Sequence, residues 1–130
     1  MTPHLHSVVL VVADQERSLD FFTRVLGWEK REDNQMGPDY RFLVVVPPGQ
    51  ATGVVLGPPH IHGRPAPTPD EPRDSDIYLQ THDLAADYER WSAQGVAFDE
   101  PPSMMPWGEL GARFQDPDGN RFFITGGAAG

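Results

Sequence analysis

Four of the five histidines occur as two His-x-His pairs, a pattern that can bind a metal ion. His4 and His6 stand just before an apolar run, and His60 and His62 lie in a proline-rich stretch. Residues two apart on a strand point to the same side, so each pair would present two imidazoles together, and imidazole is a common ligand of zinc and iron. The alternative, which we favour, is that these rings are solvated at a terminus and in a loop. We also expect His82 to be a solvated loop residue.

Asp76 is a candidate for acid–base or ligand chemistry. It begins a strand-like segment in which Tyr78 and Gln80 follow at alternate positions, so the three side chains would share one face. Asp76 could anchor a ligand amine, or act as a catalytic general base with Tyr78. The alternative is that Asp76 only caps the strand in water beside Asp74. The sequence has no cysteine, no Ser/His/Asp order in a nucleophile context and no glycine-rich phosphate loop.

Aromatic and methionine side chains form a third group of candidates, suited to a flat organic ligand. Trp107 and Met105 fall in the proline-rich stretch 101–109, where a large apolar group has little core to join. We expect them to form an adaptable lip over a cavity; the alternative is packing at a barrel edge or a subunit contact. Further aromatic candidates are Trp28, Phe42 and Phe98. For the two phenylalanines, core packing is the favoured interpretation.

The elements that would position these residues form an internal repeat. In the first half, an apolar strand, a helix-capping Asp14, an apolar helical stripe and a terminating Gly27 follow one another. Asp83 and Gly95 take the same places in the second half, so that cap and stop are displaced almost equally along the chain. The predicted strands are Val8–Val12, Trp28–Arg31, Arg41–Val46, Gly53–Leu56, Ile77–Thr81, Val96–Asp99, Gly111–Phe114 and Arg121–Thr125.

The repeat predicts a single α+β domain, 1–130, built from two β-α-β-β-β modules. Module one spans 4–57, a linker without regular structure spans 58–74, and module two spans 75–126. We expect the modules to pair into a curved, incomplete barrel with a ligand site on its concave side. Strand alternation points Ser7, Val9 and Val11 into this cavity. The predicted ligand-binding residues are Ser7, Val9, Phe42, Asp76, Tyr78, Gln80, Met105, Trp107, Arg121 and Phe123.

Composition narrows the range of partners. Ten basic and nineteen acidic residues give the 130-residue chain a net charge of −9, which disfavours nucleic acid and favours a neutral or cationic small molecule. The longest apolar run is Val8–Ala13, too short to cross a membrane, and the N-terminus does not have the pattern of a signal peptide. We therefore expect no membrane partner and a cytoplasmic location.

Short motifs in both halves resemble the glyoxalase/bleomycin-resistance/dioxygenase group, the vicinal oxygen chelate superfamily. The segments that carry the likeness are Val12–Asp14, Ser18–Phe22, Val25–Trp28 and Phe114–Asn120. The resemblance implies a homodimer with clefts at or near the interface. The family includes metal-dependent isomerases, dioxygenases, thiol transferases and metal-free drug-sequestering proteins. Within the last motif, Asp116–Asn120 reads as a hairpin turn rather than a calcium loop, because the twelfth position is Gly127 instead of Glu.

The resemblance also implies four positions for metal ligands. The first-strand positions, seven residues before each capping aspartate, are Ser7 and Asp76; the last-strand positions are Phe123 and, in module one, Leu56 or Gly57. Only Asp76 carries a competent donor for a divalent ion. We therefore predict no metal cofactor. The alternative is a divalent transition metal held by His6 and Asp76, which a one-residue register slip at Ser7 would favour.

Three functions follow from these observations. The first is a metal-free, bleomycin-resistance-type binding protein that sequesters an aromatic or hydrophobic molecule. The second is a metal-dependent glyoxalase-like lyase, isomerase or dioxygenase that uses His6 and Asp76. The third is a small acid–base enzyme that works through Asp76 and Tyr78 without metal.

Overall fold

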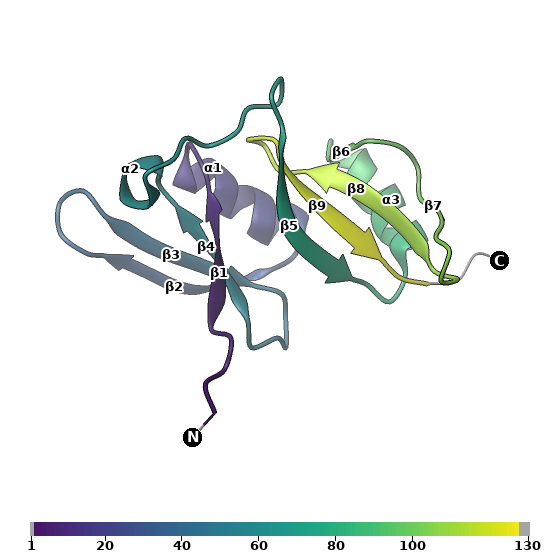
Figure 1. The fold of residues 1–130 in the computed structure, drawn as a ribbon, viewed down its shortest axis with the longest axis horizontal. Helices are drawn as coiled ribbons and strands as arrows, with labels where there is room; N and C mark the ends of the chain where they lie inside the picture. Colours follow the sequence, from purple (N-terminus) through teal and green to yellow (C-terminus); the bar gives the residue numbers. More distant parts are fainter. Residues whose placement is uncertain (1, 128–130) are drawn as a thin grey trace. The chain divides into compact units, whose positions relative to one another are not determined.

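The computed structural model describes residues 2–127, which fall into two compact units, Met1–Pro67 and Thr68–Gly130. We call them the N-terminal and C-terminal units. Each unit is a mixed α+β structure with one sheet and a helix on one face of that sheet (Figure 1). Neither sheet closes into a barrel within residues 2–127. The predicted α+β class is confirmed.

The N-terminal unit has the strand order β1-β4-β3-β2, with β1 parallel to β4 and the other pairs antiparallel. Its elements are β1 Ser7–Val11, α1 Gln15–Asp20 with a π-helical continuation over Phe21–Val25, β2 Glu29–Gln35, β3 Arg41–Val46 and β4 Gly53–Gly57. The Asp14 carboxylate accepts a hydrogen bond from the Arg17 N–H at 3.1 Å and caps α1. Gly27, at φ 81°, takes the left-handed conformation that ends the helical segment.

The C-terminal unit repeats this topology, because its first strand is also parallel to its last. Its strand order is β5-β9-β8-β6, with the short β7 paired to β8. Its elements are β5 Arg73–Gln80, α3 Leu84–Ala93, β6 Ala97–Phe98, β7 Ser103–Met104, β8 Leu110–Gln115 and β9 Asn120–Thr125. Asp83 caps α3 by accepting from the Ala86 N–H at 3.1 Å. The predicted repeat is therefore present in the structure.

Aromatic rings fill the space between α3 and its sheet. Phe114 and Phe122 stack with ring centroids 5.2 Å apart, and Trp91 from α3 lies 5.5 Å from Phe114. Phe98 contacts Phe114 from β6. In the N-terminal unit, Trp28 packs against Phe22 at 5.1 Å and is almost completely buried. Trp28 is thus a core residue and not part of an open aromatic surface.

The linker departs from the sequence prediction. A short helix, α2, spans Pro59–His62 and ends at Gly63 in the left-handed conformation, so 58–74 does contain regular structure. Strand β5 begins earlier than predicted, at Arg73, and Thr68 pairs with Glu71 just before it. The prolines of this stretch delimit the helix: Pro59 opens it, where a proline's missing N–H costs no helical hydrogen bond.

None of the helices within residues 2–127 is long and apolar enough to cross a lipid bilayer.

Candidate functional site

Strand β5 presents its alternate side chains on the face of its sheet opposite α3. Tyr78 and Gln80 are exposed on β5, whereas Ile77 and Leu79, which alternate with them, are partly buried. The register places Tyr78 beside Phe123 of β9, and Phe123 beside Arg113 of β8. The outer face of the C-terminal sheet therefore carries an aromatic and cationic row across three strands.

Three aromatic rings on this face form what we call the aromatic row: Tyr78, Phe123 and Trp107. The Phe123 centroid lies 5.2 Å from that of Tyr78 and 6.3 Å from that of Trp107, both edge-on. The Arg113 guanidinium carbon lies 5.1 Å from the centre of the Phe123 ring, within the range of a cation–π contact. Tyr78 is 72% exposed and Trp107 is 57% exposed. Such exposed rings are a surface on which a flat ligand can stack.

Hydrogen bonds define the conformation of the segment that carries Trp107. The Gly108 N–H donates to the Met105 carbonyl at 3.0 Å, and the Met105 N–H donates to the Glu109 carbonyl at 2.7 Å, so Trp107 lies in a tight turn that joins β7 and β8. The indole Nε1 donates to Glu109 Oε1 at 2.9 Å, and Gln80 Nε2 lies 3.4 Å from Glu109 Oε2. One carboxylate thus connects the turn to β5.

A cavity of about 230 Å³ lies beside Phe123 on the β8 side. We call it the Met105 pocket; its lining residues are Asp99, Glu100, Ser103, Met105, Gly111, Ala112, Arg113 and Phe123. A Cβ atom on Gly111 would lie 2.7 Å from Met105 Cγ and 3.2 Å from Phe123 Cζ. The absence of a side chain at 111 is therefore what allows Met105 to pack down beside Phe123.

Two arginine–aspartate pairs flank the aromatic row. Arg113 Nη1 lies 3.1 Å from Asp74 Oδ2, and Arg121 pairs with Asp99. Arg121 was predicted to line the site; the structure places it on the same face of β9 as Phe123, partly buried and committed to Asp99. The two arginine charges of the face are thus each balanced by a carboxylate.

Asp76 occupies an irregular position in β5. Its φ of 58° is the one left-handed value among the non-glycine residues of 2–127, and the pairing register with β9 shifts between Asp74 and Ile77. The Asp76 N–H donates to Asp74 Oδ1 at 2.9 Å. The exposed Asp76 side chain is therefore set on a kinked segment, and the predicted general-base pairing of Asp76 with Tyr78 stays a prediction.

The candidates in the N-terminal unit do not form a comparable surface. Val9 is 39% exposed, but Val11, predicted to face a cavity, is buried. Phe42 is partly buried and meets the ring of Tyr40 edge-on at 6.3 Å. Ser7 is partly buried, and its hydroxyl lies 3.0 Å from the Nδ1 atom of His6.

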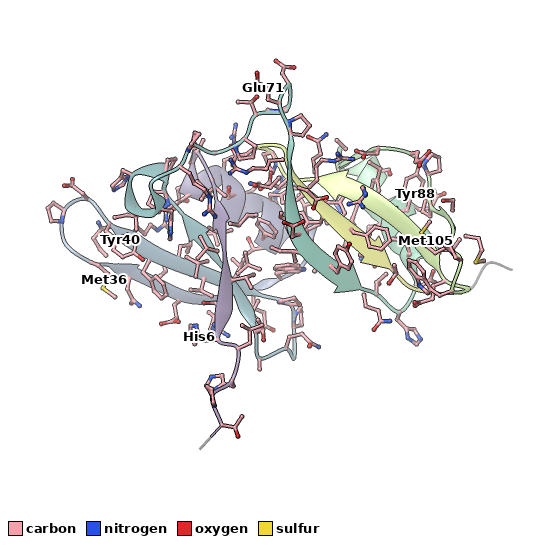
Figure 2. All side chains as sticks on the ribbon, viewed as in Figure 1. His6, Met36, Tyr40, Glu71, Tyr88 and Met105 are labelled. Atoms are coloured by element: carbon pink, nitrogen blue, oxygen red, sulfur yellow. The ribbon has the colours of Figure 1, made fainter. Side chains whose placement is uncertain are left out.

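His6 immediately precedes β1 (Figure 2), and charged side chains lie close to its ring. Its Nε2 atom is 3.6 Å from a Glu32 carboxylate oxygen and 3.4 Å from an Arg31 guanidinium nitrogen. Arg31 also donates to the His6 carbonyl at 3.1 Å. A guanidinium this close to the imidazole opposes binding of a cation at the same nitrogen.

The second histidine pair lies on α2 and not in a solvated loop. His60 Nε2 is 2.6 Å from the Asp39 carbonyl oxygen. His62 packs its ring against Gly57, in the space that a Cβ at 57 would need, and its Nε2 atom is buried without a partner among the described residues. Burial, together with the nearby Arg64, lowers the pKa of His62. His4 and His82 are exposed.

The donor set for a metal ion is poor within residues 2–127. No group of three or more His, Asp or Glu side chains there is arranged to hold an ion. His6 belongs to the N-terminal unit and Asp76 to the C-terminal unit. Of the positions where the resemblance places ligands, Gly57 has no side chain and Phe123 is an aromatic ring in the row.

Sequence reasoning missed several residues of this face. The residues not predicted are Ser103, Glu100, Asp99, Glu109, Gly111 and Arg113. Alternation along β8 could have indicated Arg113 and Gly111, because they lie two residues apart on this strand and therefore share one face of the sheet. Glu109 had no such signal, because its role depends on how the turn at Trp107 folds back.

Comparison with known proteins identifies the fold. The family model for the Glyoxalase/Bleomycin resistance protein/Dioxygenase superfamily matches residues 4–124. A superfamily member from Sphaerobacter thermophilus DSM 20745 has a crystal structure that is 42% identical in sequence, with a TM-score of 0.88 over 97% of this chain and 98% of that one. The Bacillus subtilis protein YetH, uncharacterized by its own description, is 30% identical over 124 residues, which are 95% of this chain and 98% of YetH.

A further similar structure is that of TnmS3, an antibiotic binding protein from Streptomyces sp. CB03234. It is 32% identical, with a TM-score of 0.80, and the match covers 98% of each chain. The family match spans nearly all of both units, and the same topology recurs in the relatives' structures. This chain therefore belongs to the glyoxalase/bleomycin resistance protein/dioxygenase superfamily.

Proposed function

We propose that this protein binds a flat aromatic or hydrophobic small molecule and sequesters it without covalent change and without a metal cofactor. The observation that carries the proposal is the aromatic row on the outer face of the C-terminal sheet. An exposed tyrosine and an exposed tryptophan meet the same phenylalanine there, beside a cavity. Large aromatic side chains left in water at one place are typical of a binding surface.

Two further observations support the proposal. Glu109 holds the Trp107 indole by a 2.9 Å hydrogen bond, so part of the ordering that ligand binding requires is already present in the free protein. TnmS3, which shares the fold at 32% identity, binds an antibiotic. Small-molecule binding is thus a function that this fold performs in a relative.

The metal-free part of the proposal rests on the donor set. Phe123 supplies a stacking ring where the resemblance implies a carboxylate, and the Arg31 guanidinium lies against the imidazole of His6. Elemental analysis of the untagged protein after dialysis tests this part. We expect less than stoichiometric zinc, iron, manganese and nickel. One equivalent of any of them per chain would favour the metal-dependent enzyme instead.

Ligand binding can be tested with a thermal-shift screen of planar compounds. We expect at least one to stabilise the protein by about 2.7 kcal/mol at a hundred times its Kd, because a ligand that binds only the folded state adds this free energy. Trp107 reports the same event by fluorescence. It is 57% exposed, whereas Trp28 and Trp91 are buried, so an added quencher reaches Trp107 selectively, and the ligand should protect it.

Matched variants show whether the bound compound lies on the aromatic row. Trp107→Ala should weaken binding roughly tenfold through the loss of about 1–1.5 kcal/mol of ring contact. Met104→Ala is the control: Met104 is 49% exposed in the same segment, but it pairs with Leu110 and so faces away from Gly111 and Phe123. The proposal would be refuted if the parent protein, Trp107→Ala and Met104→Ala bound the compound equally, or if no planar compound raised the melting temperature.

Two further parts of the proposal do not depend on the geometry of the site: a homodimeric state, which the family resemblance implies, and a cytoplasmic location, which was expected from the sequence. The lack of cysteine agrees with a reducing compartment. Sedimentation equilibrium at micromolar concentration measures the homodimeric state directly.

A further inference from the structure

The Met105 pocket is too small to hold a drug-sized molecule alone. Its volume of about 230 Å³ lies below the roughly 300–1,000 Å³ of typical small-molecule sites. Phe123 belongs both to the pocket and to the aromatic row, with Tyr78 on its β5 side and Arg113 on its β8 side. A molecule whose ring lies on the row can therefore extend a narrower part past Phe123 into the pocket.

The polar groups of the pocket favour one kind of chemistry. Two carboxylates line the pocket: Asp99, which is paired with Arg121, and Glu100. When ionised, a carboxylate can only accept hydrogen bonds. The Arg113 guanidinium is already bound to Asp74 at 3.1 Å and lies over the Phe123 ring. A ligand anion here would approach the carboxylates of Asp74, Asp99 and Glu100, whereas an N–H or O–H group would find acceptors.

We infer that the ligand has two parts: a flat ring that stacks on the aromatic row, and a short arm whose N–H or O–H end enters the Met105 pocket. The inference rests on the proposed function and adds the chemical class of the ligand. It also assigns a specificity role to Gly111, since a Cβ at this position would lie 2.7 Å from Met105 Cγ. Gly111 sets the depth available to the arm.

A series of four naphthalenes tests the arm while the ring stays constant. The probes are 1-methylnaphthalene, 1-naphthylmethanol, 1-naphthylmethylamine and 1-naphthylacetate, with dissociation constants measured by ligand-observed NMR. We expect the alcohol and the amine to bind about fivefold more tightly than the methyl compound, as one added hydrogen bond predicts, and the acetate to bind most weakly. The ratio of alcohol to amine then shows whether the donor is neutral or charged.

Two variants locate the effect in the pocket. Gly111→Ala should push Met105 into the cavity and remove the advantage that the alcohol and the amine have over the methyl compound. The φ of Gly111 lies outside the left-handed range, so alanine is compatible with the backbone conformation at this position. Glu100→Gln keeps an acceptor and removes the charge, so it should weaken the amine and spare the alcohol. Met104→Ala again serves as the control.

The outcomes separate the two hypotheses. Equal binding of all four probes, an acetate that binds as tightly as the alcohol, or an unchanged preference in Gly111→Ala would overturn the two-part ligand, while ring stacking and the proposed function stand. If no probe binds the parent protein and the planar screen is also negative, the proposed function fails, and the two-part ligand fails with it.

Discussion

Phe122→Ala is expected to destabilise the C-terminal unit severely, whereas Phe123→Ala is expected to leave it folded but to weaken binding of its ligand. The two phenylalanines are neighbours on β9 and point to opposite faces of the sheet. Phe122 is fully buried and stacks on Phe114 at 5.2 Å. Its truncation should lower the free energy of unfolding by about 3–5 kcal/mol, since both the buried ring and its packing are lost.

Phe123 is only partly buried, and its ring is the centre of the aromatic row. We expect Phe123→Ala to cost about 1 kcal/mol of stability and to weaken binding of a planar ligand by at least tenfold, because Tyr78 and Trp107 lose their common partner. Urea unfolding followed by the emission of Trp91, which is buried in this unit, measures the first effect, and ligand titration the second. Equal stability losses in the two variants would contradict the assignment of the faces.

The topology was predictable because each half carries the same local signals. Asp14 and Asp83 each accept from a backbone N–H near the helix start, and Gly27 and Gly95 both take positive φ values. These are interactions between residues close in sequence, and their residue types reveal them. Alternation likewise placed Tyr78, Gln80 and Phe123 on one face of the C-terminal sheet.

The details of the site depend on contacts between residues distant in sequence. Arg113 meets Asp74 across 39 positions and Gln80 meets Glu109 across 29, and no local pattern indicates either pair. The α2 helix was missed because prolines surround it and it is only four residues long, too short for an apolar period to appear. The burial of Val11 was missed because alternation gives the face of a side chain and not what covers it.

The turn between β8 and β9 contains a carboxyl group that should make stability depend on pH. Asp116 is 4% exposed and accepts from the N–H groups of Asp118 and Asn120, at 3.0 and 2.8 Å, and from the Asn120 side-chain amide at 2.9 Å. Burial raises the pKa of Asp116 to about 6, with the Asp118 carboxylate adding to the shift, even though these three donors act in the opposite direction.

The sign of the effect follows from proton binding. Between the ordinary aspartate pKa and pH 6 the folded protein holds a proton on Asp116 that the unfolded chain has released, so the free energy of unfolding falls as pH rises. The full loss is about 3 kcal/mol, complete above pH 6. Asp33, whose pKa is lowered by its hydrogen bond to Arg41, affects stability only at more acidic pH. There the unfolded chain takes up a proton on Asp33 before the folded protein does, so the free energy of unfolding falls as pH falls. His62, whose pKa is lowered by burial, acts in the opposite direction just below its ordinary value.

Asp116→Asn isolates the contribution of Asp116 to the pH dependence, because asparagine does not titrate. Its side-chain oxygen can still accept the hydrogen bonds that the backbone N–H groups of Asp118 and Asn120 donate to Asp116 Oδ1. His62 and Asp33 are present in both proteins, so their effects cancel in the difference between parent and variant. We expect that difference, measured by urea unfolding, to move by about 2.4 kcal/mol in favour of the variant between pH 4 and pH 7, because pH 4 already lies slightly above the ordinary aspartate pKa. A difference that moves in favour of the parent protein would mean that the three donors outweigh burial, and that the turn requires the ionised carboxylate.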